Sequence, residues 1–332
     1  MSTPASTTPS ALPGAGGSRR AALLRLLRPF AGLAVVVALF TALEPEVFLS
    51  AYNLKTVATQ TVIVGLGALG MTFVIVAGGI DLAAGSVIAL SSVVTAALLR
   101  EGWAPLPAAA AGTAAGALAG AVSGLLIVGL RVVPFIATLG MMGVARGLAK
   151  LFADEQKIDA PPGWLGTAMS KAPEDTWLGL PPGVWLLFAL AALMALVLRH
   201  TPLGLHAAAI GSNERTARLC GVPVGARKVA VYALGGAFAG LAGVMTFARL
   251  TVGDPTTAVG AELDIIAAVV IGGASLSGGS GSILGSLLGA FLMAFLANGC
   301  NLTGVPNYVQ EILIGGIIVA AVAVDQLRAR RA

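Results

Sequence analysis

Long apolar runs alternate with short polar segments along the chain, which has 332 residues. A run of about 20 apolar residues is long enough for an α-helix to cross the hydrocarbon core of a bilayer. The eighth apolar run is short and is expected to begin a little earlier, so the number of spans depends most on residues 262–285. The pattern predicts an all-α, polytopic helical membrane protein with ten spans, at residues 23–43, 54–77, 85–99, 106–129, 134–152, 184–198, 229–250, 263–271, 281–299 and 306–324.

Composition supports the bilayer as the surroundings of this chain. The residues are 57% apolar and only 11% charged, and the mean hydropathy is +0.92. Soluble domains carry about 25% charged residues, more than twice this level. The net charge of +5 is explained by arginines retained on the cytoplasmic side of a membrane, so we expect no nucleic-acid partner.

The charged residues divide between the polar segments by sign. With the N-terminus inside the cell, thirteen of the twenty basic residues fall on cytoplasmic segments, and the outer segments collect acids. The positive-inside rule then makes both termini cytoplasmic, residues 200–228 a cytoplasmic loop and residues 153–183 a loop on the outer side. This predicts a multi-pass membrane protein. Cys220 and Cys300 would lie on opposite sides, which excludes a disulfide between them.

The N-terminal residues do not share the apolar pattern. Residues 1–18 are mainly Ser, Thr, Pro, Ala and Gly, and we expect a disordered cytoplasmic tail. Residues 19–332 are expected to form a single transmembrane domain. Arg19, Arg20, Arg25 and Arg28 ahead of an apolar run also resemble the start of a signal peptide. Because many spans follow, an uncleaved first helix is favoured.

The longest polar interruption of the C-terminal half, residues 204–232, contains a candidate short helix. Ser212 or Asn213 suits its N-cap, Glu214 suits its positive start, and Gly221 before Val222 and Pro223 ends it. None of the five lysines follows a glycine, so the chain has no phosphate-binding loop for ATP. We interpret the helix as the place where a separate ATPase acts, through Ser212, Asn213, Glu214, Arg215, Ala217, Arg218, Leu219 and Gly221.

Glycine recurs in two other patterns. Gly112, Gly116, Gly120 and Gly124 form a ridge for close helix approach. Residues 78–86 match residues 272–280 at five of nine positions, at an offset of 194, which indicates an internal repeat. Such paired glycine-rich breaks often lie near a transport path, and the repeat elbows here are Gly78, Gly79, Gly85, Gly272, Gly273 and Gly279.

The chain shows no enzyme or metal site, since His200 and His206 lack acidic or cysteine neighbours at metal-binding spacing. Ionisable residues are scarce within the spans, which weighs against an ion-coupled carrier and favours a neutral solute. Asp81 aligns with Ser275 in the repeat, so capping a helix explains it as well as a role with substrate or protons. The candidates for the transport path are Asp81, Gln60, Asn298, Asn307 and Gln310, and hydrogen bonding between helices accounts for the amides equally well.

Four sequence runs, in order and at normal spacing, resemble the permease subunits of ribose-type ABC importers of bacteria. They are VIVAGGIDLAAGSVIALSS (74–92), RVVPFIATLGMMGVARGLA (131–149), TPLGLHAAAIGSNERTARLCGVPV (201–224) and ELDIIAAVVIGGASLSGGSGSILGSLLGA (262–290). The resemblance covers residues 54–331 and implies a place in the bacterial inner membrane, with residues 153–183 as a periplasmic loop. It implies a type II-like importer permease that pairs with a second permease copy, ATPase subunits and a periplasmic binding protein. ATP and Mg would bind to the ATPase, and this chain would carry no cofactor.

Family substrates are mainly pentoses and hexoses, with some nucleosides and signalling sugars, so the resemblance implies a small neutral carbohydrate. The chain departs from the family pattern at Leu205, where arginine is usual, and at Arg215-Thr216, where paired alanines are usual. Both changes fall on the expected ATPase face and put the contact with that partner in question. A passive channel or an ion-coupled carrier for a small neutral solute is the alternative function.

Overall fold

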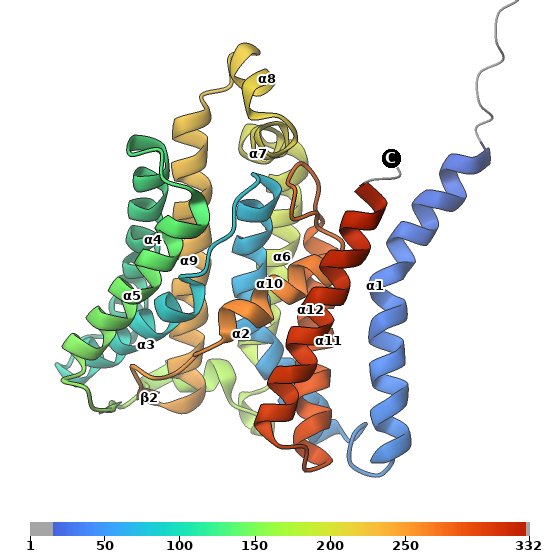
Figure 1. Cartoon of the computed structure of the whole chain (residues 1–332). Coiled ribbons are helices and arrows are strands. Elements are labelled where there is room, and N and C mark those ends of the chain that lie inside the picture. The colour runs from blue at the N-terminus through green and yellow to red at the C-terminus, as the bar shows by residue number, and fades with distance from the viewer. Residues whose placement is uncertain (1–15, 330–332) are drawn as a thin grey trace, which may run out of the picture.

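The computed structural model describes residues 16–329, with the side chains of residues 30–320 and of Ala323. Within that part the chain is almost entirely helical (Figure 1). The first half comprises α1 (Gly16–Leu43), α2 (Ala51–Val76), α3 (Ala84–Arg100), α4 (Pro105–Gly129) and α5 (Pro134–Phe152). The second half comprises α6 (Pro182–His200), α7 (Pro202–Ser212), α8 (Glu214–Leu219), α9 (Val224–Leu250), α10 (Ala261–Ile271), α11 (Ile283–Leu302) and α12 (Asn307–Ala329).

Each of the ten expected spans lies on one of these helices. Among the described residues, six helices are long and apolar enough to cross a membrane: α2, α4, α5, α6, α9 and α11. Shorter apolar stretches lie in α1, α3 and α12. The eighth expected span is α10, which begins at Ala261 and has 11 residues. At about 1.5 Å per residue it reaches only about half-way across a bilayer. The expected tail lies mostly outside the described residues, and α1 already begins at Gly16.

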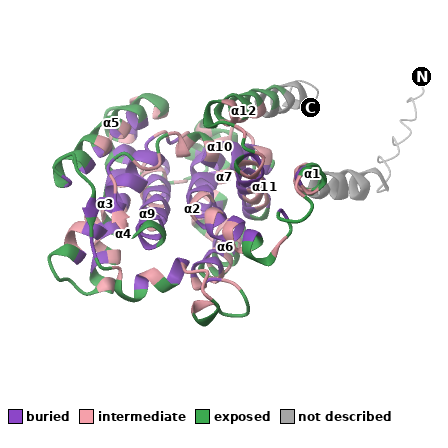
Figure 2. Cartoon of the chain, turned by 90° about the horizontal axis from the view of Figure 1, so that it is seen from below, coloured by how far each residue is buried: buried purple, intermediate pink, exposed green. Residues whose placement is uncertain are grey.

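Helix α2 forms the centre of the bundle and is apolar on every side. Its membrane-spanning window is 89% buried, and Figure 2 shows it enclosed by other helices. Three glycines let three neighbours approach: Gly65 meets Leu187 of α6, Gly67 meets Ile265 of α10, and Gly70 meets α9 at Gly235 and Phe238. A helix without a polar face is stable only inside protein or lipid, which is the environment that this arrangement provides.

The glycine ridge of α4 packs as expected. Gly116 and Gly120 lie directly against Gly236 of α9, so close that a methyl group on either one would overlap backbone atoms. Gly124 continues the contact at Val229. On α11, Gly285 and Gly289 face α10 in the same way, at Gly272 and Ala268. Close backbone approach of this kind is the usual way in which membrane helices associate.

One small sheet was not expected from the sequence. β1 (Ile158–Asp159) pairs antiparallel with β2 (Val252–Gly253), and Lys157 forms an ion pair with Asp254 beside it, at 3.2 Å. This sheet and the 3₁₀ helices η1 (Gly163–Met169) and η2 (Pro173–Asp175) belong to the segments that connect spans. β2 lies at the end of the bundle opposite α8 (Figure 1).

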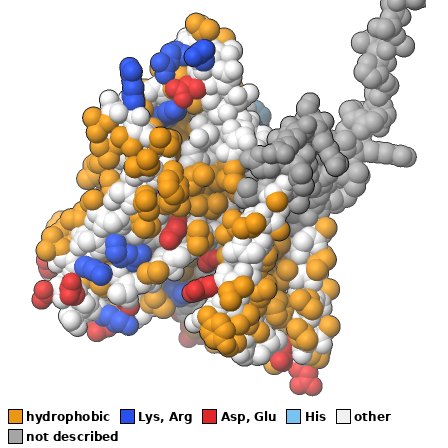
Figure 3. All heavy atoms as spheres, in the orientation of Figure 1, with side chains coloured by type: hydrophobic (Ala, Val, Ile, Leu, Met, Phe, Trp, Pro, Cys, Tyr) orange, Lys and Arg blue, Asp and Glu red, His pale blue; other side chains and the backbone are white. Residues whose placement is uncertain are grey.

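The two ends of the bundle differ in character. Figure 3 shows Lys and Arg side chains both at the end that carries α8 and towards the opposite end, where most of the visible acidic side chains also lie. The C-terminal end of α12 and the start of α1 lie towards the α8 end (Figure 1). A broad band of hydrophobic side chains separates the two ends (Figure 3), as expected of a bundle surrounded by lipid.

Candidate functional site

The expected short helix is present as α8, and its two ends are closed by the residues that the sequence offers. Asn213 is the N-cap, and its Oδ1 accepts a hydrogen bond of 2.9 Å from the backbone N–H of Thr216. At the other end Gly221 adopts φ +82°, and the Val222 N–H donates to the carbonyl of Ala217. This is a C-terminal cap that requires a left-handed residue, for which glycine carries no steric cost. Ser212 is the last residue of α7 instead.

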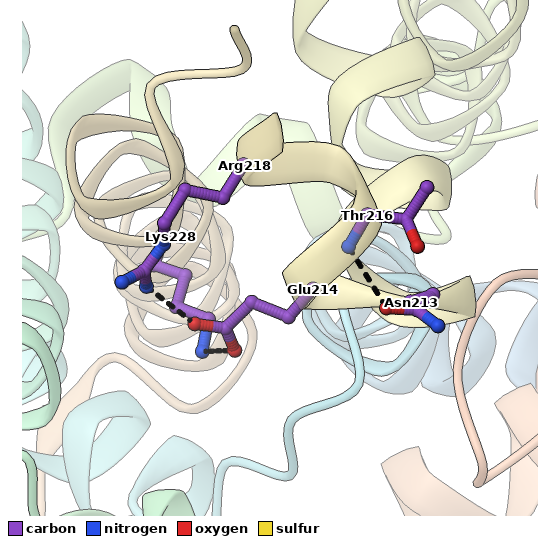
Figure 4. A network of polar contacts seen from close by, with 5 residues as sticks. All are labelled: Asn213, Glu214, Thr216, Arg218 and Lys228. Atoms are coloured by element: carbon purple, nitrogen blue, oxygen red, sulfur yellow. Dashed lines mark hydrogen bonds and ion pairs between the residues drawn. The ribbon is translucent and has the colours of Figure 1, made fainter. Parts of the chain in front are cut away.

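Glu214 ties α8 to the first turn of α9. Its carboxylate accepts Lys228 Nζ at 2.6 Å and Arg218 Nη2 at 3.0 Å (Figure 4). The hydrogen bond from Lys228 is the main cause that lowers the pKa of Glu214 from its ordinary value of 4.5, although partial burial opposes the shift. The carboxylate therefore stays charged at neutral pH and holds α8 against α9.

The remaining residues of the helix divide between an inner and an outer side. Ala217 is buried and packs with Ile210 of α7 and with Val224 of α9. Arg215 is exposed, and Leu219 is the most exposed large apolar side chain of the described residues, at 83%. A contact of Leu219 and of the other predicted residues of α8 with an ATPase stays a prediction. The spacing of residues in the sequence alone did not predict that Ala217 is buried and Leu219 exposed.

The base of the coupling segment α7–α8 rests on the two glycine-rich loops of the expected repeat. The backbone N–H of Gly279 donates to the carbonyl of Val76 at 2.9 Å, which joins the loops to each other. Gly211 of α7 lies on this junction: a methyl group there would overlap the Val76 carbonyl oxygen and lie 2.5 Å from Gly279 N. Gly78 and Gly278 approach Gly211 from the two loops. Gly211 was not among the residues predicted to form the site. The only indication in the sequence was that a small residue stands directly before Ser212.

The two loops begin with the same helix-ending geometry. Gly79 N–H donates to Val74 O after α2, and Ala274 N–H donates to Val269 O after α10. Gly78 and Gly273 take the left-handed conformation, with φ of +80° and +95°. These pairs are 195 residues apart, one more than the offset of the sequence match. The other elbows pack tightly: Gly79 against Tyr232, Gly85 against Glu262, Gly272 against Gly285, and Gly279 against Ser212.

Asp81 and its counterpart Ser275 make the same local bond. Asp81 Oδ1 accepts from the N–H of Ala83 at 2.8 Å, one residue before α3 begins. Ser275 Oγ accepts from the N–H of Ser277 at 3.3 Å. Both side chains thus hold a local turn within a loop, but Asp81 does not cap α3, whose N-cap is Ala83 without a side-chain hydrogen bond. A role of Asp81 in transport stays a prediction.

The other path candidates belong to separate hydrogen-bond networks. Asn298 of α11 pairs with Asn53 of α2 through two reciprocal amide bonds of 2.9 Å, both residues being buried. Gln310 donates to Asn301 Oδ1 at 2.9 Å and lies 3.4 Å from Asn307 Oδ1, close to the turn between α11 and α12. Gln60 is different, because its buried Oε1 has no hydrogen-bond partner among the described residues. A place on the transport path stays a prediction for all of them.

The histidines and acids of the described residues do not form a metal-binding group of three or more. His206 accepts a hydrogen bond from Arg227 Nε at 3.0 Å, which joins α7 to α9. The polar chemistry at this end of the bundle therefore fixes the position of helices.

Comparison with known proteins places this architecture in a family. Residues 53–322 match the family described as "Branched-chain amino acid transport system / permease component". The chain belongs to this permease family. It is 42% identical to the ribose import permease protein RbsC of Bacillus subtilis, over 92% of this chain and 94% of the relative. It is 35% identical to the L-arabinose transport system permease protein AraH of Escherichia coli, over 91% of this chain and 90% of the relative. No solved structure matches the chain.

Family membership fixes the class of activity. The chain is a multi-pass membrane protein and a permease subunit of a bacterial ABC importer, so it is a transport component and not an enzyme. Subunits of this kind carry no cofactor and work with an ATPase and a substrate-binding protein. The family description names amino acids, whereas the curated relatives are named for sugars, so the family description alone does not give the substrate.

Proposed function

We propose that this permease moves a small neutral sugar of the pentose or hexose class, which a periplasmic binding protein delivers and ATP hydrolysis by a partner drives. The observation that carries the substrate class is the full-length similarity to relatives named for ribose, L-arabinose and D-allose. The scarcity of charge within the spans supports it, since a neutral solute needs no counter-charge.

The coupling helix of this proposal is α8, which lies at the cytoplasmic side together with both termini. The excess of basic over acidic side chains at the α8 end (Figure 3) and the positive-inside rule support this orientation. All four tryptophans, Trp103, Trp164, Trp177 and Trp185, lie on segments outside α7–α9 that flank or connect spans. Trp and Tyr prefer the level of the lipid headgroups, so these segments fit the periplasmic boundary.

The ATPase acts on α8, and the contact between Gly211 and the repeat loops carries the motion inward. A rigid-body shift of α7–α8 cannot occur without moving Val76 or Gly279, because no space separates their backbones from Gly211. The loops lead directly into α3 and α11. ATP binding would therefore shift the permease between two states through contacts that differ between them.

The proposed importer contains two permease copies. Each copy has the ten-span topology and the internal repeat. Helix α5 supports a dimer, since Gly140, Gly143 and Gly147 recur on it with no other atoms within 4 Å. Membrane helices use such small-residue faces to approach other helices. The similar loops after α2 and α10 support the repeat, with α10 as its short, discontinuous helix.

The test is uptake of radiolabelled sugars into proteoliposomes that contain the permease, its ATPase and its binding protein. The expected result is ATP-dependent uptake of one pentose or hexose, with sugar-stimulated ATP hydrolysis. Uptake that continues without ATP and without the ATPase would establish the channel or carrier alternative. ATP-driven uptake of a nucleoside or a branched-chain amino acid, with none of any sugar, would overturn the substrate class and keep the importer.

A further inference from the structure

A groove of about 700 Å³ lies beside α8, between the turn that joins α4 to α5 and the start of α9. Its charged lining consists of Arg131, Arg218, Lys228 and Glu214. The rest of the lining is apolar or backbone, from Ile127, Val128, Val132, Val133, Pro134, Val224 and Gly225. The groove thus combines a basic rim with apolar walls at the end of membrane-spanning helices.

Positive charge exceeds negative charge in this groove by two. Glu214 is shared between Arg218 and Lys228, so one carboxylate serves two cations. Arg131 is exposed and forms no hydrogen bond or ion pair with any residue that the structure describes. Its backbone takes φ +55°, a left-handed conformation that is unfavourable for arginine and fixes it at the corner between α4 and α5. Excess cations held in a concave site favour a ligand with a negative charge.

The surroundings of the groove indicate what kind of anion it suits. Leu125 of α4, Leu130 just after that helix, and Phe135 and Ile136 of α5 are exposed next to it along the chain. Figure 3 shows the basic side chains of the α8 end directly above hydrophobic ones. A phosphate in the groove with hydrocarbon chains attached would leave those chains against this apolar surface, whereas an acidic peptide would leave it uncovered.

We propose that the groove binds the phosphate headgroup of an anionic phospholipid from the bilayer leaflet next to α8. Arg131 provides the unpaired cation, and Arg218 and Lys228 provide the others. Basic pockets between membrane helices at this level are suited to such headgroups. Since Arg218 and Lys228 also hold Glu214, the bound phosphate competes for the ion pairs that fasten α8 to α9. The site is independent of which solute the permease moves.

The experiment is native mass spectrometry of the purified permease titrated with phosphatidylglycerol and, separately, with zwitterionic phosphatidylcholine. Arg131→Gln is expected to weaken phosphatidylglycerol binding about five-fold, the effect of one cation at a membrane surface, and to leave phosphatidylcholine binding unchanged. Arg131→Lys keeps the charge and is expected to bind nearly as the wild type does. Arg215→Gln is the control, because Arg215 is an exposed arginine of α8 that does not line the groove.

Three results would overturn the proposal. One is equal affinity of the wild type for the two lipids, and another is an effect of Arg215→Gln as large as that of Arg131→Gln. The third is weaker association of the ATPase subunit with the Arg131→Gln permease at unchanged phosphatidylglycerol affinity, which would assign the groove to an acidic segment of that partner. Thermal unfolding of each variant, expected to match the wild type, separates loss of the site from loss of the fold.

Discussion

Gly279 and Val76 are joined by a backbone hydrogen bond of 2.9 Å, although 203 residues separate them in the chain. The bond connects the loop after α2 with the loop before α11, and Gly211 of α7 covers it. The junction brings together α7, the end of α2 and the loop before α11. In the proposed mechanism it is the point at which a movement of α8 reaches the membrane core.

Replacing Gly211 by alanine should separate ATP hydrolysis from transport. The added methyl group overlaps the Val76 carbonyl oxygen, so α7 must lift off the two loops. Overpacking of this kind costs about 1–3 kcal/mol of stability. We expect sugar uptake to fall at least ten-fold in proteoliposomes, while ATP hydrolysis by the assembled complex continues.

Gly129→Ala is the matched control for this change, since Gly129 is the last residue of α4 and has no other atoms within 4 Å. It should transport as the wild type does. Wild-type uptake by Gly211→Ala, at an unchanged unfolding temperature, would show that the contact transmits nothing.

The reciprocal amide pair of Asn53 and Asn298 should be structural. Removing one amide leaves buried polar atoms of the other without their partner, although Asn53 Nδ2 keeps its hydrogen bond to the Phe48 carbonyl, so each single alanine variant should lose stability. In a double-mutant cycle the coupling energy should be about 0.6 kcal/mol and at most about 1.7 kcal/mol, the range for hydrogen bonds between membrane helices. Unfolding in mixed micelles measures it. Loss of uptake in Asn298→Ala at wild-type stability would instead support its place on the transport path.

Leu219 should be the apolar anchor for the ATPase. Its side chain is 83% exposed, whereas that of Ala217 is 4% exposed, so only Leu219 can be changed without disturbing the packing of α7 and α8. We expect Leu219→Asp to weaken ATPase binding at least ten-fold, or by about 1.4 kcal/mol or more. Titration of the ATPase against the permease in nanodiscs measures this change.

Leu178→Asp provides the comparison for Leu219→Asp. Leu178 is also a highly exposed leucine, but it lies in the segment between η2 and α6. Its substitution should leave ATPase affinity unchanged. Equal affinity for both variants and the wild type would rule out α8 as the coupling helix.

The ion pair between Glu214 of α8 and Lys228 of α9 should weaken at low pH. The pKa of Glu214 is lowered in the folded protein, mainly by the hydrogen bond from Lys228. A lowered pKa stabilises the fold fully above the ordinary value of 4.5, and this stabilisation is lost as the pH falls through the lowered pKa. The unfolding temperatures of the wild type and of Glu214→Gln should therefore differ at pH 7 and converge towards pH 3.

Glu174→Gln serves as the reference in that series, because Glu174 is exposed and forms no ion pair with a described residue. Its pH profile should follow that of the wild type. A constant difference between Glu214→Gln and the wild type from pH 7 to pH 3 would contradict the assignment.

Most of the spanning helices could be predicted from the sequence because their apolar runs are long and are bounded by polar residues, prolines or glycines, whereas the run of α10 is short. The cap at Asn213 and the stop at Gly221 were predictable for the same reason, since they depend on local chemistry. The contacts of α4 with α9 could be predicted only in part, because the glycine ridge indicates a packing face of α4 but not which helix packs on it. The sheet of β1 and β2 could not be predicted, since two residues carry no pattern.

The site was less predictable where it depends on distant parts of the chain. Nothing near Asn298 indicates that Asn53 is its partner, and nothing near Gly211 indicates that two loops meet beneath it. The inner and outer sides of α8 also depend on where α7 and α9 lie, so the burial of Ala217 and the exposure of Leu219 could not be read from six residues of helix.

The enclosure of α2 has a consequence for the biosynthesis of this permease. α2 leaves the ribosome second among the helices, but the residues that fill its glycine positions come much later: Leu187 follows Gly65 by 122 residues, and Ile265 follows Gly67 by 198. Until those helices are inserted, the glycine faces of α2 can meet only lipid. The centre of the bundle is therefore completed late, and a nascent chain that stops before Ala261 leaves its central helix without its α10 neighbour.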